Sequence, residues 1–358
     1  MSQKMRAVVF KGPHKISLED RPIPKIIDET DALVKVSYTA LCGSELHVFR
    51  GHQPSDTGFI MGHEFTGTIV QVGKGVTRFQ TGDKVISPFT TSCLECFYCK
   101  NGYTSRCAQS MLYGSVKLDG GQAEYVRVPL ADGTLFKAPP EIPEETVFPT
   151  GYFAASNGLS QLTPTQRDNA TVVLIGCGPV GLCALIAATS FNPARIFAID
   201  SVPSRLELAK SLGAEPLNFM EDKNAVKKRI TEATDGRGAD VVLEVVGNSP
   251  ALRMGFDVVR PWGVIISVGV HNAEIPFTGN EAYNKNVRIQ FGRCPVHAVF
   301  PEALELLKKK SHLLGSRTQR SQIQSFMSDK IMPMSQAEEG YELFDKMKVQ
   351  KVIFRADQ

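Results

Sequence analysis

The sequence predicts an α/β protein in which a β-rich part is joined to a doubly wound domain. The first 150 residues contain short β-type runs separated by Gly, Pro, Asp and Lys turns. From Val172 to Val268, buried-type strands alternate with helical stretches. A glycine-rich string also stands directly after the first of these buried strands. Strands and helices that alternate at this spacing indicate βαβ units around a parallel sheet.

Each expected element rests on its own pattern. The expected strands of the first part are MRAVVF, ALVKVSYTAL, EFTGTIVQV, DKVIS and QAEYVRV. The doubly wound part has strands TVVLIG, ARIFAID, ADVVLEVVG and GVIISVG, and helices over PVGLCALIAATSF, PSRLELAKSLGA, DKNAVKKRITEAT and SPALRMGFDVV. After residue 290, two helical patterns, PEALELLKKK and SQAEEGYELFDKM, precede a closing strand, KVIF.

Length and composition limit the class of protein. A chain of 358 residues is long enough for roughly two domains. Hydrophobic residues make up 42% and charged residues 22%, which is typical of a globular protein and excludes disorder or coiled coil for the whole. A net charge of +3 indicates no nucleic-acid or membrane-surface partner. The uncharged run 170–194 is interpreted as strand, tight turn and buried helix rather than a membrane span.

Eight cysteines and an N-terminus without an apolar signal core favour a reducing, cytoplasmic location. Cys93, Cys96, Cys99 and Cys107 follow the spacing C-x2-C-x2-C-x7-C. Three cysteines at intervals of three can turn their sulfurs to one point, and the fourth closes a tetrahedron. Four thiolates leave a zinc ion no open position, so this pattern predicts a structural zinc site. Disulfides or an iron–sulfur cluster are weaker alternatives because neither the compartment nor the spacing suits them.

The string Gly176-Cys-Gly-Pro-Val-Gly181 has the pattern G-x-G-x-x-G and opens a helix. The first glycine allows the tight turn, the second lets a pyrophosphate approach, and the third packs helix on strand. Asp200 ends the next strand, where a carboxylate accepts hydrogen bonds from a ribose diol and repels a 2′-phosphate, which predicts NAD rather than NADP. The candidate cofactor-binding residues of the turn are Gly176, Gly178, Val180 and Gly181.

Two further segments supply metal ligands of catalytic type. Cys42 and the pair His63-Glu64 together offer a thiolate, an imidazole and a carboxylate, which suit zinc. A catalytic zinc keeps one position open and acts there as a Lewis acid. Ser44 and His47 add a hydroxyl and an imidazole, the parts of a proton path to solvent.

With these motifs in hand, the sequence resembles the zinc-containing medium-chain alcohol dehydrogenase family over essentially its whole length. The segments that carry the resemblance are ALCGSELH, GFIMGHEFTG, TGDKVISPF, the four-cysteine segment, GGQAEYVRVP, FPTGYFAA, VLIGCGPVG and AIDSVPSRLELA. The resemblance implies a GroES-like catalytic domain over residues 1–151, a Rossmann NAD-binding domain over 152–290, and a return to the catalytic domain over 291–358. It also implies a homodimer or homotetramer and an alcohol, aldehyde or ketone substrate. The branch that looks nearest includes glutathione-independent formaldehyde dehydrogenases.

The resemblance also assigns roles residue by residue. It implies that Cys42 and His63 are catalytic zinc ligands, with Glu64 a supporting or exchangeable one, and that Ser44 and His47 relay protons. The cofactor side is implied at five positions: Asp200 at the adenosine ribose, Arg205 near the adenine, Val268 and Val270 along the nicotinamide, and Lys351 at the pyrophosphate.

One position departs from the family. The third zinc ligand is expected three residues before Pro149, where this chain has Thr146, a poor ligand because its hydroxyl stays protonated. Glu144 and Glu145 are candidate substitutes if the loop re-aims them. We therefore expect a full four-cysteine site and a partly filled, chelator-sensitive site at Cys42 and His63. The alternative function is a nicotinamide-binding reductase or a non-catalytic member whose catalytic zinc site is degraded.

Overall fold

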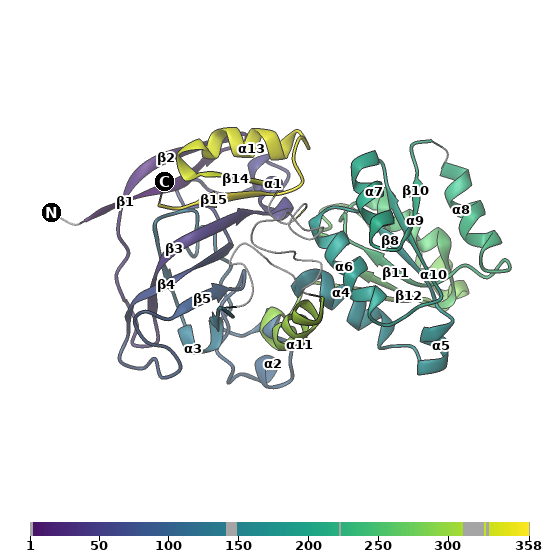
Figure 1. Cartoon of the computed structure of the whole chain (residues 1–358), viewed down its shortest axis with the longest axis horizontal. Coiled ribbons are helices and arrows are strands. Elements are labelled where there is room, and N and C mark those ends of the chain that lie inside the picture. Colours follow the sequence, from purple (N-terminus) through teal and green to yellow (C-terminus); the bar gives the residue numbers. More distant parts are fainter. Residues whose placement is uncertain (1–2, 141–148, 222, 311–325, 327–328, 358) are drawn as a thin grey trace. The chain divides into compact units, whose positions relative to one another are not determined.

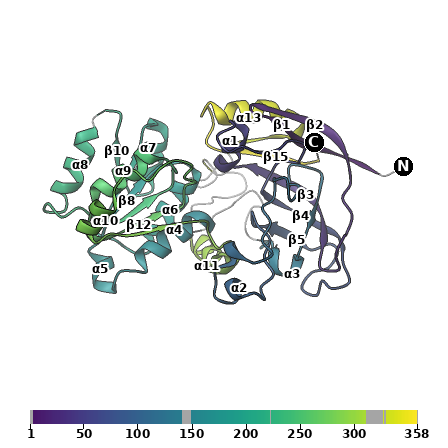
Figure 2. The same cartoon turned by 180° about the vertical axis from the view of Figure 1, so that it is seen from behind.

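The computed structural model of the chain describes residues 3–140, 149–221, 223–310, 326 and 329–357. The chain divides into two compact units. Unit 1 comprises Met1–Val147, Pro295–Ala298 and Lys310–Gln358, and unit 2 comprises Phe148–Cys294 and Val299–Lys309. Each unit has its own sheets (Figures 1 and 2). The division expected from sequence, after residues 151 and 290, stays a prediction.

Unit 1 is built mainly from antiparallel strands. Its smaller sheet pairs β1 (Lys4–Gly12) with β2 (Lys15–Pro22). Its larger sheet has the order β14 (Lys330–Pro333), β15 (Val352–Arg355), β3 (Ala32–Leu41), β4 (Glu64–Val72), β5 (Lys84–Ser87) and β7 (Phe136–Lys137), with β6 (Tyr125–Val128) also paired to β3. The closing strand β15 thus returns to pair with β3 from the other end of the chain (Figure 1).

Short helices and apolar clusters complete unit 1. The helices are α1 (Gly43–Phe49), α2 (Phe97–Lys100), α3 (Ala131–Thr134) and α13 (Ala337–Asp345), with 3₁₀ turns at Thr104–Arg106 and Met334–Gln336. One cluster packs α1 and α13 against the strands through fully buried side chains such as Leu41, Tyr341 and Phe354. A second cluster, which includes Phe65 and Tyr113, fills the space beneath β3, β4 and β6. The cores therefore fix the ends of β3 and β4, where the metal-ligand candidates stand.

Unit 2 is a six-stranded sheet in which every neighbouring pair is parallel. The order is β10 (Glu215–Asn218), β9 (Arg195–Asp200), β8 (Thr171–Ile175), β11 (Ala239–Glu244), β12 (Val259–Ser267) and β13 (Arg288–Phe291). The chain moves outward from β8 in one direction and then crosses to β11 and continues in the other. This reversal between β8 and β11 is a topological switch point, where open α/β sheets bind ligands at the carboxyl ends of the strands.

Helices cover both faces of this sheet. The helices of unit 2 are α4 (Pro149–Leu159), α5 (Pro164–Asp168), α6 (Pro179–Thr189), α7 (Pro203–Ser211), α8 (Lys223–Glu232), α9 (Ser249–Val258), α10 (Gly279–Lys285) and α11 (Val296–Lys309), and the first residues of α11 belong to unit 1. Alternate residues of β11 show the two layers: Val241 lies against α4 at Gly158, whereas Val242 lies against α9 at Gly255. Strands buried on both faces read as continuous apolar runs, and this one is fully buried.

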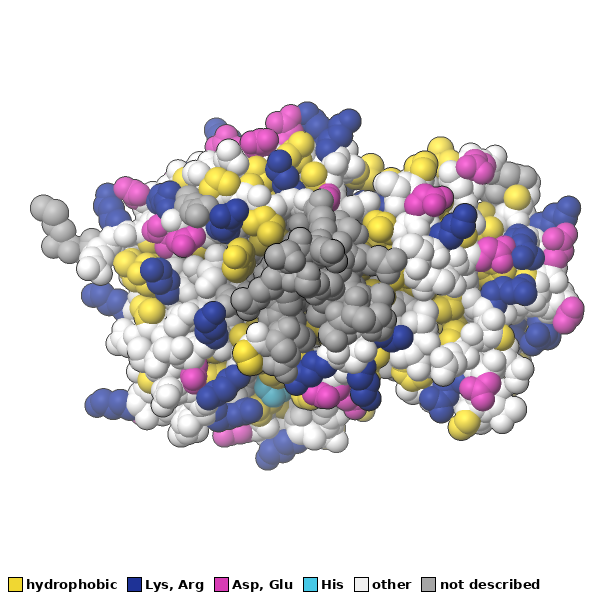
Figure 3. Space-filling view, in the orientation of Figure 1, with side chains coloured by type: hydrophobic (Ala, Val, Ile, Leu, Met, Phe, Trp, Pro, Cys, Tyr) yellow, Lys and Arg dark blue, Asp and Glu magenta, His cyan; other side chains and the backbone are white. Residues whose placement is uncertain are grey.

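The uncharged run 170–194 forms β8, a glycine turn and α6, as expected. Among the described residues, no helix combines the length and the apolar character that a membrane crossing requires. On the face of the molecule shown in Figure 3, basic and acidic side chains lie interspersed over both units, as the nearly balanced charge suggests.

Candidate active site and metal centres

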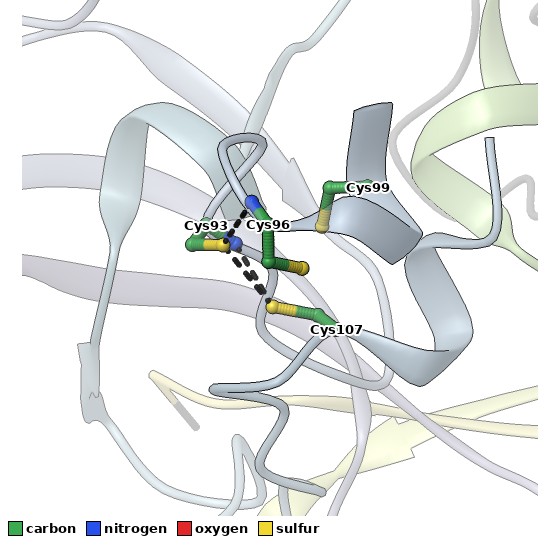
Figure 4. Close-up of side chains that lie close together, drawn as sticks. All are labelled: Cys93, Cys96, Cys99 and Cys107. Atoms are coloured by element: carbon green, nitrogen blue, oxygen red, sulfur yellow. Dashed lines mark hydrogen bonds between the residues drawn. The ribbon is translucent and has the colours of Figure 1, made fainter. Parts of the chain in front are cut away.

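The four-cysteine segment folds as a lobe of unit 1 around α2. The sulfurs of Cys93, Cys96, Cys99 and Cys107 all lie within 4.8 Å of one another, and all four thiols are free (Figure 4). The amides of Cys96 and Ala108 point at sulfurs, at 3.4 Å and 3.5 Å. Backbone N–H groups aimed at sulfur stabilise thiolates. The lobe therefore fits a tetrahedral metal ion held by four thiolates.

The thiols of the lobe differ in acidity. Amide hydrogen bonds, led by that of Ala108, lower the pKa of Cys96 to about 6. Burial raises the pKa of Cys99 to about 12 and also raises the pKa of Cys107. Protons must therefore leave this lobe when a metal binds, and its metal affinity falls as the pH falls.

The second cluster stands where β3 ends and β4 begins. Ligand atoms of Cys42, His63 and Glu64 lie within 4.8 Å of one another. The antiparallel pairing of Ala40 with Glu64 brings these segments together although they are distant in sequence. Cys42 also caps α1, so its position is fixed from both the strand and the helix. A thiol, an imidazole and a carboxylate at this spacing fit a zinc ion that retains an open position.

Charge around this cluster is tightly balanced. Burial raises the pKa of the Cys42 thiol, and the neighbouring Glu64 adds to the effect. Burial also acts to raise the pKa of Glu64, but Lys351 and His63 together outweigh it, so that the pKa of Glu64 is lower than usual. The Lys351 ammonium donates to Glu64 Oε2 at 2.6 Å. A metal ion bound at this cluster would therefore compete with Lys351 for the Glu64 carboxylate.

Ser44 and His47 lie on α1, three residues apart. Ser44 Oγ donates to Cys42 Sγ at 3.3 Å and lies 3.2 Å from His63 Nε2. Burial, together with His52 and Arg50, lowers the pKa of His47, which is half-buried. Within the described part of the chain, no hydrogen bond joins Ser44 to His47. The structure thus brings Ser44 to the metal cluster, and a proton path through His47 stays a prediction.

In unit 2, the three glycines of the turn differ in the way expected. Gly176 has φ +96°. A Cβ added at Gly181 would stand 1.9 Å from the Gly176 carbonyl oxygen, so helix and turn meet without room for a side chain. A Cβ at Gly178 would meet nothing within 4 Å. Gly178 therefore presents open backbone at the N-terminus of α6, where partial positive charge favours a phosphate.

The remaining cofactor candidates surround this turn. The Asp200 carboxylate accepts hydrogen bonds from the amides of Cys177 and Ser201, both at 2.7 Å, and Arg205 lies 4.0 Å away. Val180 is half-buried at the start of α6. Val268 and Val270 follow β12 at its carboxyl edge, and Val270 is 38% exposed. All of these residues lie at the carboxyl edge of the sheet.

Comparison with known proteins decides the family. Residues 28–140 match the alcohol dehydrogenase GroES-like domain, and residues 179–309 match the zinc-binding dehydrogenase domain. A zinc-type alcohol dehydrogenase B of Aspergillus flavus is 63% identical over 99% of this chain and 82% of its own length. The chain belongs to the zinc-containing alcohol dehydrogenase family. This dehydrogenase is thus a zinc-dependent oxidoreductase with a GroES-like and a Rossmann-type domain, and the family implies NAD as its cofactor.

Two further relatives show how far the similarity extends. A medium chain reductase/dehydrogenase of Acremonium is 52% identical over 78% of this dehydrogenase and 98% of its own length. The solved structure of the alcohol dehydrogenase TADH from Thermus sp. ATN1 has a TM-score of 0.87 and 33% identity, and the match covers 98% and 99% of the two chains. The placement near formaldehyde dehydrogenases stays a prediction.

A buried polar chain, which the sequence patterns did not indicate, lies beside the metal cluster of this dehydrogenase. Glu45 Oε1 lies 3.9 Å from His63 Nδ1, and Glu45 Oε2 accepts from the Cys42 amide at 2.8 Å. Gln122 donates to Glu45 at 3.3 Å and accepts from Tyr341 at 2.9 Å. A carboxylate behind a ligating histidine orients the ring. The signal in the sequence was a glutamate three residues after Cys42, the third position of a capping box.

Two expectations are left as they stood. Thr146, Glu144 and Glu145, the positions discussed for a third ligand, lie outside the described residues. Lys351 is buried in unit 1 against Glu64, and its role at the cofactor pyrophosphate stays a prediction.

Proposed function

We propose that this dehydrogenase interconverts a small alcohol and its aldehyde or ketone with NAD, using Cys42, His63 and Glu64 as its catalytic zinc ligands. The observation that carries the proposal is the convergence of a thiol, an imidazole and a carboxylate within 4.8 Å beside Ser44. The domain division proposed with it, 1–151, 152–290 and 291–358, is supported by the pairing of β15 with β3.

When bound, the metal supplies Lewis-acid polarisation of the substrate oxygen, and NAD supplies the hydride acceptor. Ser44 Oγ accepts the proton of the alcohol hydroxyl and passes its own proton toward His47. The lowered pKa of His47 keeps its imidazole neutral near pH 7, so it can accept that proton and release it to solvent. Cys93, Cys96, Cys99 and Cys107 would hold a second zinc, which would stabilise the lobe and take no part in the reaction.

Cofactor choice follows from Asp200 and from the residue directly after it, which is Ser201 rather than an arginine. Backbone amides hold the Asp200 carboxylate at the end of β9, where it faces a ribose and repels a 2′-phosphate. We expect NADH to bind at least about tenfold more tightly than NADPH. Titration calorimetry checks this directly. It is preferable to fluorescence because Trp262 stands in the first half of β12, away from its carboxyl end. Equal or tighter NADPH binding contradicts the assignment.

The test of the function is a panel of primary and secondary alcohols with NAD, measured before and after chelation and after zinc is restored. Oxidation that disappears on chelation and returns with zinc supports the proposal. Oxidation that survives with one zinc per chain removes the catalytic role of Cys42 and His63. NAD binding without oxidation of any alcohol favours the alternative of a non-catalytic member.

Assembly and location are part of the same proposal. We propose a homodimer or homotetramer in the cytoplasm, because family members of this kind assemble in that way and all eight cysteines are free thiols. Sedimentation of the purified chain distinguishes these states from a monomer.

A further inference from the structure

A buried polar cluster lies at the carboxyl edge of the parallel sheet and has no role in the function proposed above. Glu244 ends β11, Ser267 ends β12, and the two are register partners. Ser267 Oγ donates to Glu244 Oε2 at 2.6 Å. His271 Nε2 lies 2.9 Å from both of these oxygens. Glu244 and Ser267 are fully buried, and the His271 side chain is 13% exposed.

The contacts determine which nitrogen of His271 carries a proton. A carboxylate only accepts hydrogen bonds, and the Ser267 hydroxyl has one proton, which it donates in its hydrogen bond to Glu244. If Nε2 of His271 carried a lone pair, it would face the lone pairs of Glu244 Oε2 at 2.9 Å. Nε2 is therefore protonated and donates toward the carboxylate and the serine oxygen.

This arrangement is not that of a hydrolase. In a nucleophilic triad, one ring nitrogen of the histidine faces the serine and the other faces the acid. Here the same nitrogen faces both, and Ser267 has no exposed surface. The role of the cluster is therefore to anchor the neighbouring backbone turns, not to activate a nucleophile.

Two turns are held by this cluster. The amides of Val246 and Gly247 donate to Glu244 Oε1 at 2.8 Å and 2.7 Å, and the Val268 amide donates to the Glu244 carbonyl at 3.0 Å. The turns are also packed backbone against backbone: a Cβ on Gly269 would stand 2.2 Å from the Gly247 nitrogen. Both turns after β11 and β12 are thus anchored at Glu244.

His271 closes the arch formed by residues 268–270. Its ring packs edge-on against Phe291, at 5.6 Å between centroids, and Phe291 ends β13. The side chain therefore spans the ends of three neighbouring strands, and the arch cannot swing away while the contact with Glu244 persists.

The anchored turns lie next to the glycine turn. A Cβ at Gly176 would stand 2.7 Å from a methyl group of Val246, so Val246 packs on the turn at which a pyrophosphate is expected. Val246 and Val270 are 41% and 38% exposed at this edge. They present apolar surface at the switch point, beside the site that the glycine turn offers to phosphate.

We propose that Glu244, Ser267 and His271 form a clamp that fixes the Val268–Val270 arch and thereby positions the nicotinamide end of the cofactor. The three are positioning residues, because they act on the ring through the arch. The inference rests on the proposed function to the extent that NAD is the cofactor. It adds a specific expectation: loss of the clamp weakens binding of the nicotinamide half and spares the adenosine half.

The test compares NADH with ADP-ribose, which lacks the nicotinamide, by titration calorimetry of the intact metal-loaded enzyme. The variants are His271→Ala, His271→Gln and Ser267→Ala, with Asn272→Ala as a matched control at an exposed neighbouring position. Gln retains an N–H donor that can reach Glu244, and Ser267→Ala makes a minimal change inside the core. Hydrogen exchange of peptides that cover residues 245–248 and 268–271 reports the anchoring of the two turns without any ligand.

We expect His271→Ala to raise the Kd for NADH by about fivefold to tenfold, because binding of the nicotinamide half must then order the released arch, with the Kd for ADP-ribose unchanged. Exchange in both peptides should accelerate, Ser267→Ala should act in the same direction, and His271→Gln should recover most of the NADH affinity. Equal weakening of both ligands, or no weakening of either, overturns the clamp and leaves the proposed function intact. A parent enzyme that binds neither NADH nor NADPH overturns the proposed function itself.

Discussion

Ser44 contacts two of the three proposed catalytic zinc ligands, and this position makes its hydroxyl the first group to test. Replacing Ser44 by Ala removes the atom that accepts the substrate proton, so we expect kcat to fall by about 10²-fold. Ser44→Thr keeps a hydroxyl and should retain far more activity. Rates are measured from pH 6 to 10 on samples of equal zinc content, with Ser17→Ala as the control serine. Near-parent rates across this range in Ser44→Ala would remove Ser44 from the proton path.

His297 gives unit 1 a specific sensitivity to acid. Burial, with a contribution from Arg78, lowers its pKa to about 4, and its Nε2 has no hydrogen-bond partner among the described residues. The unfolded chain binds the proton more tightly, with a pKa of 6.5, so stability is lost as the pH falls from about 6.5 toward 4. His297→Phe keeps an aromatic ring packed against Phe136, where the ring centroids are 4.6 Å apart, and removes this titration.

We therefore expect His297→Phe to raise the melting temperature at pH 5 by about 2–4 °C, equivalent to about 1 kcal/mol after allowance for partial exposure, and by less at pH 8. His297→Gln is the control, because it removes both the titration and the ring contact with Phe136. A gain for His297→Phe that is equal at both pH values would show that proton binding at His297 is not responsible.

Single residues were predictable from sequence where chemistry alone marks them. Cysteine spacing and the histidine–glutamate pair indicated candidate metal ligands without any knowledge of the fold, and the structure brings each set of candidates together. The position of Glu45 at the metal cluster was not predicted, because a glutamate three residues after a helix start is also an ordinary capping residue. Its position behind His63 depends on the pairing of β3 with β4. The cluster of Glu244, Ser267 and His271 was not predicted for the same reason, because only the register of neighbouring strands brings these residues together.

The glycine turn is the element in which local geometry bears most directly on function. Gly181→Ala would place a methyl group 1.9 Å from a backbone oxygen, so α6 must shift. We expect the free energy of unfolding to fall by about 2 kcal/mol. We also expect NADH binding to be lost. The methyl group added by Gly178→Ala has no protein atom within 4 Å, so this variant should leave the melting temperature nearly unchanged. It should still raise the Kd for NADH at least about tenfold, because the methyl group enters the space of the pyrophosphate.

Thermal unfolding and calorimetry of both variants separate these effects, and each variant serves as the control for the other. Normal NADH affinity in Gly178→Ala would mean that no phosphate approaches this backbone. Normal stability in Gly181→Ala would mean that the helix and turn are less closely packed than the structure indicates.

At the scale of elements, periodicity identified strands and helices that bury a regular pattern. The runs ALVKVSYTAL and EFTGTIVQV coincide with β3 and β4. Helix α4 was not predicted from the sequence, because Gly151 and Gly158 suggest a break in the helical pattern. In the structure these glycines allow close contact: a Cβ at Gly151 would stand 2.5 Å from the Ala184 nitrogen of α6, and one at Gly158 would stand 2.8 Å from Val241. A glycine that permits tight packing has the same local signal as one that ends a helix.

At the scale of the whole chain, the return of the C-terminal part brings Lys351 to the metal cluster. Strand β15 pairs with β3, and Lys351, next to this strand, reaches Glu64. Sequence predicted the return from the family pattern, but the ion pair depends on tertiary packing. This pair bears on the third zinc ligand, because a Glu64 carboxylate that binds Lys351 is less available to a metal.

Zinc stoichiometry therefore tests the whole arrangement. Four converging thiols should retain zinc through dialysis against a mild chelator, whereas Cys42 and His63, supported by a Glu64 that Lys351 also binds, should lose part of theirs. We expect between one and two zinc ions per chain after such dialysis, close to one in Cys42→Ser, and unfolding or aggregation of the lobe in Cys99→Ser. Atomic emission analysis of the dialysed protein measures this. A steady two zinc ions after chelation would reveal a third strong ligand, and the first place to seek it is Glu144 or Glu145, by substituting each with Gln and repeating the measurement.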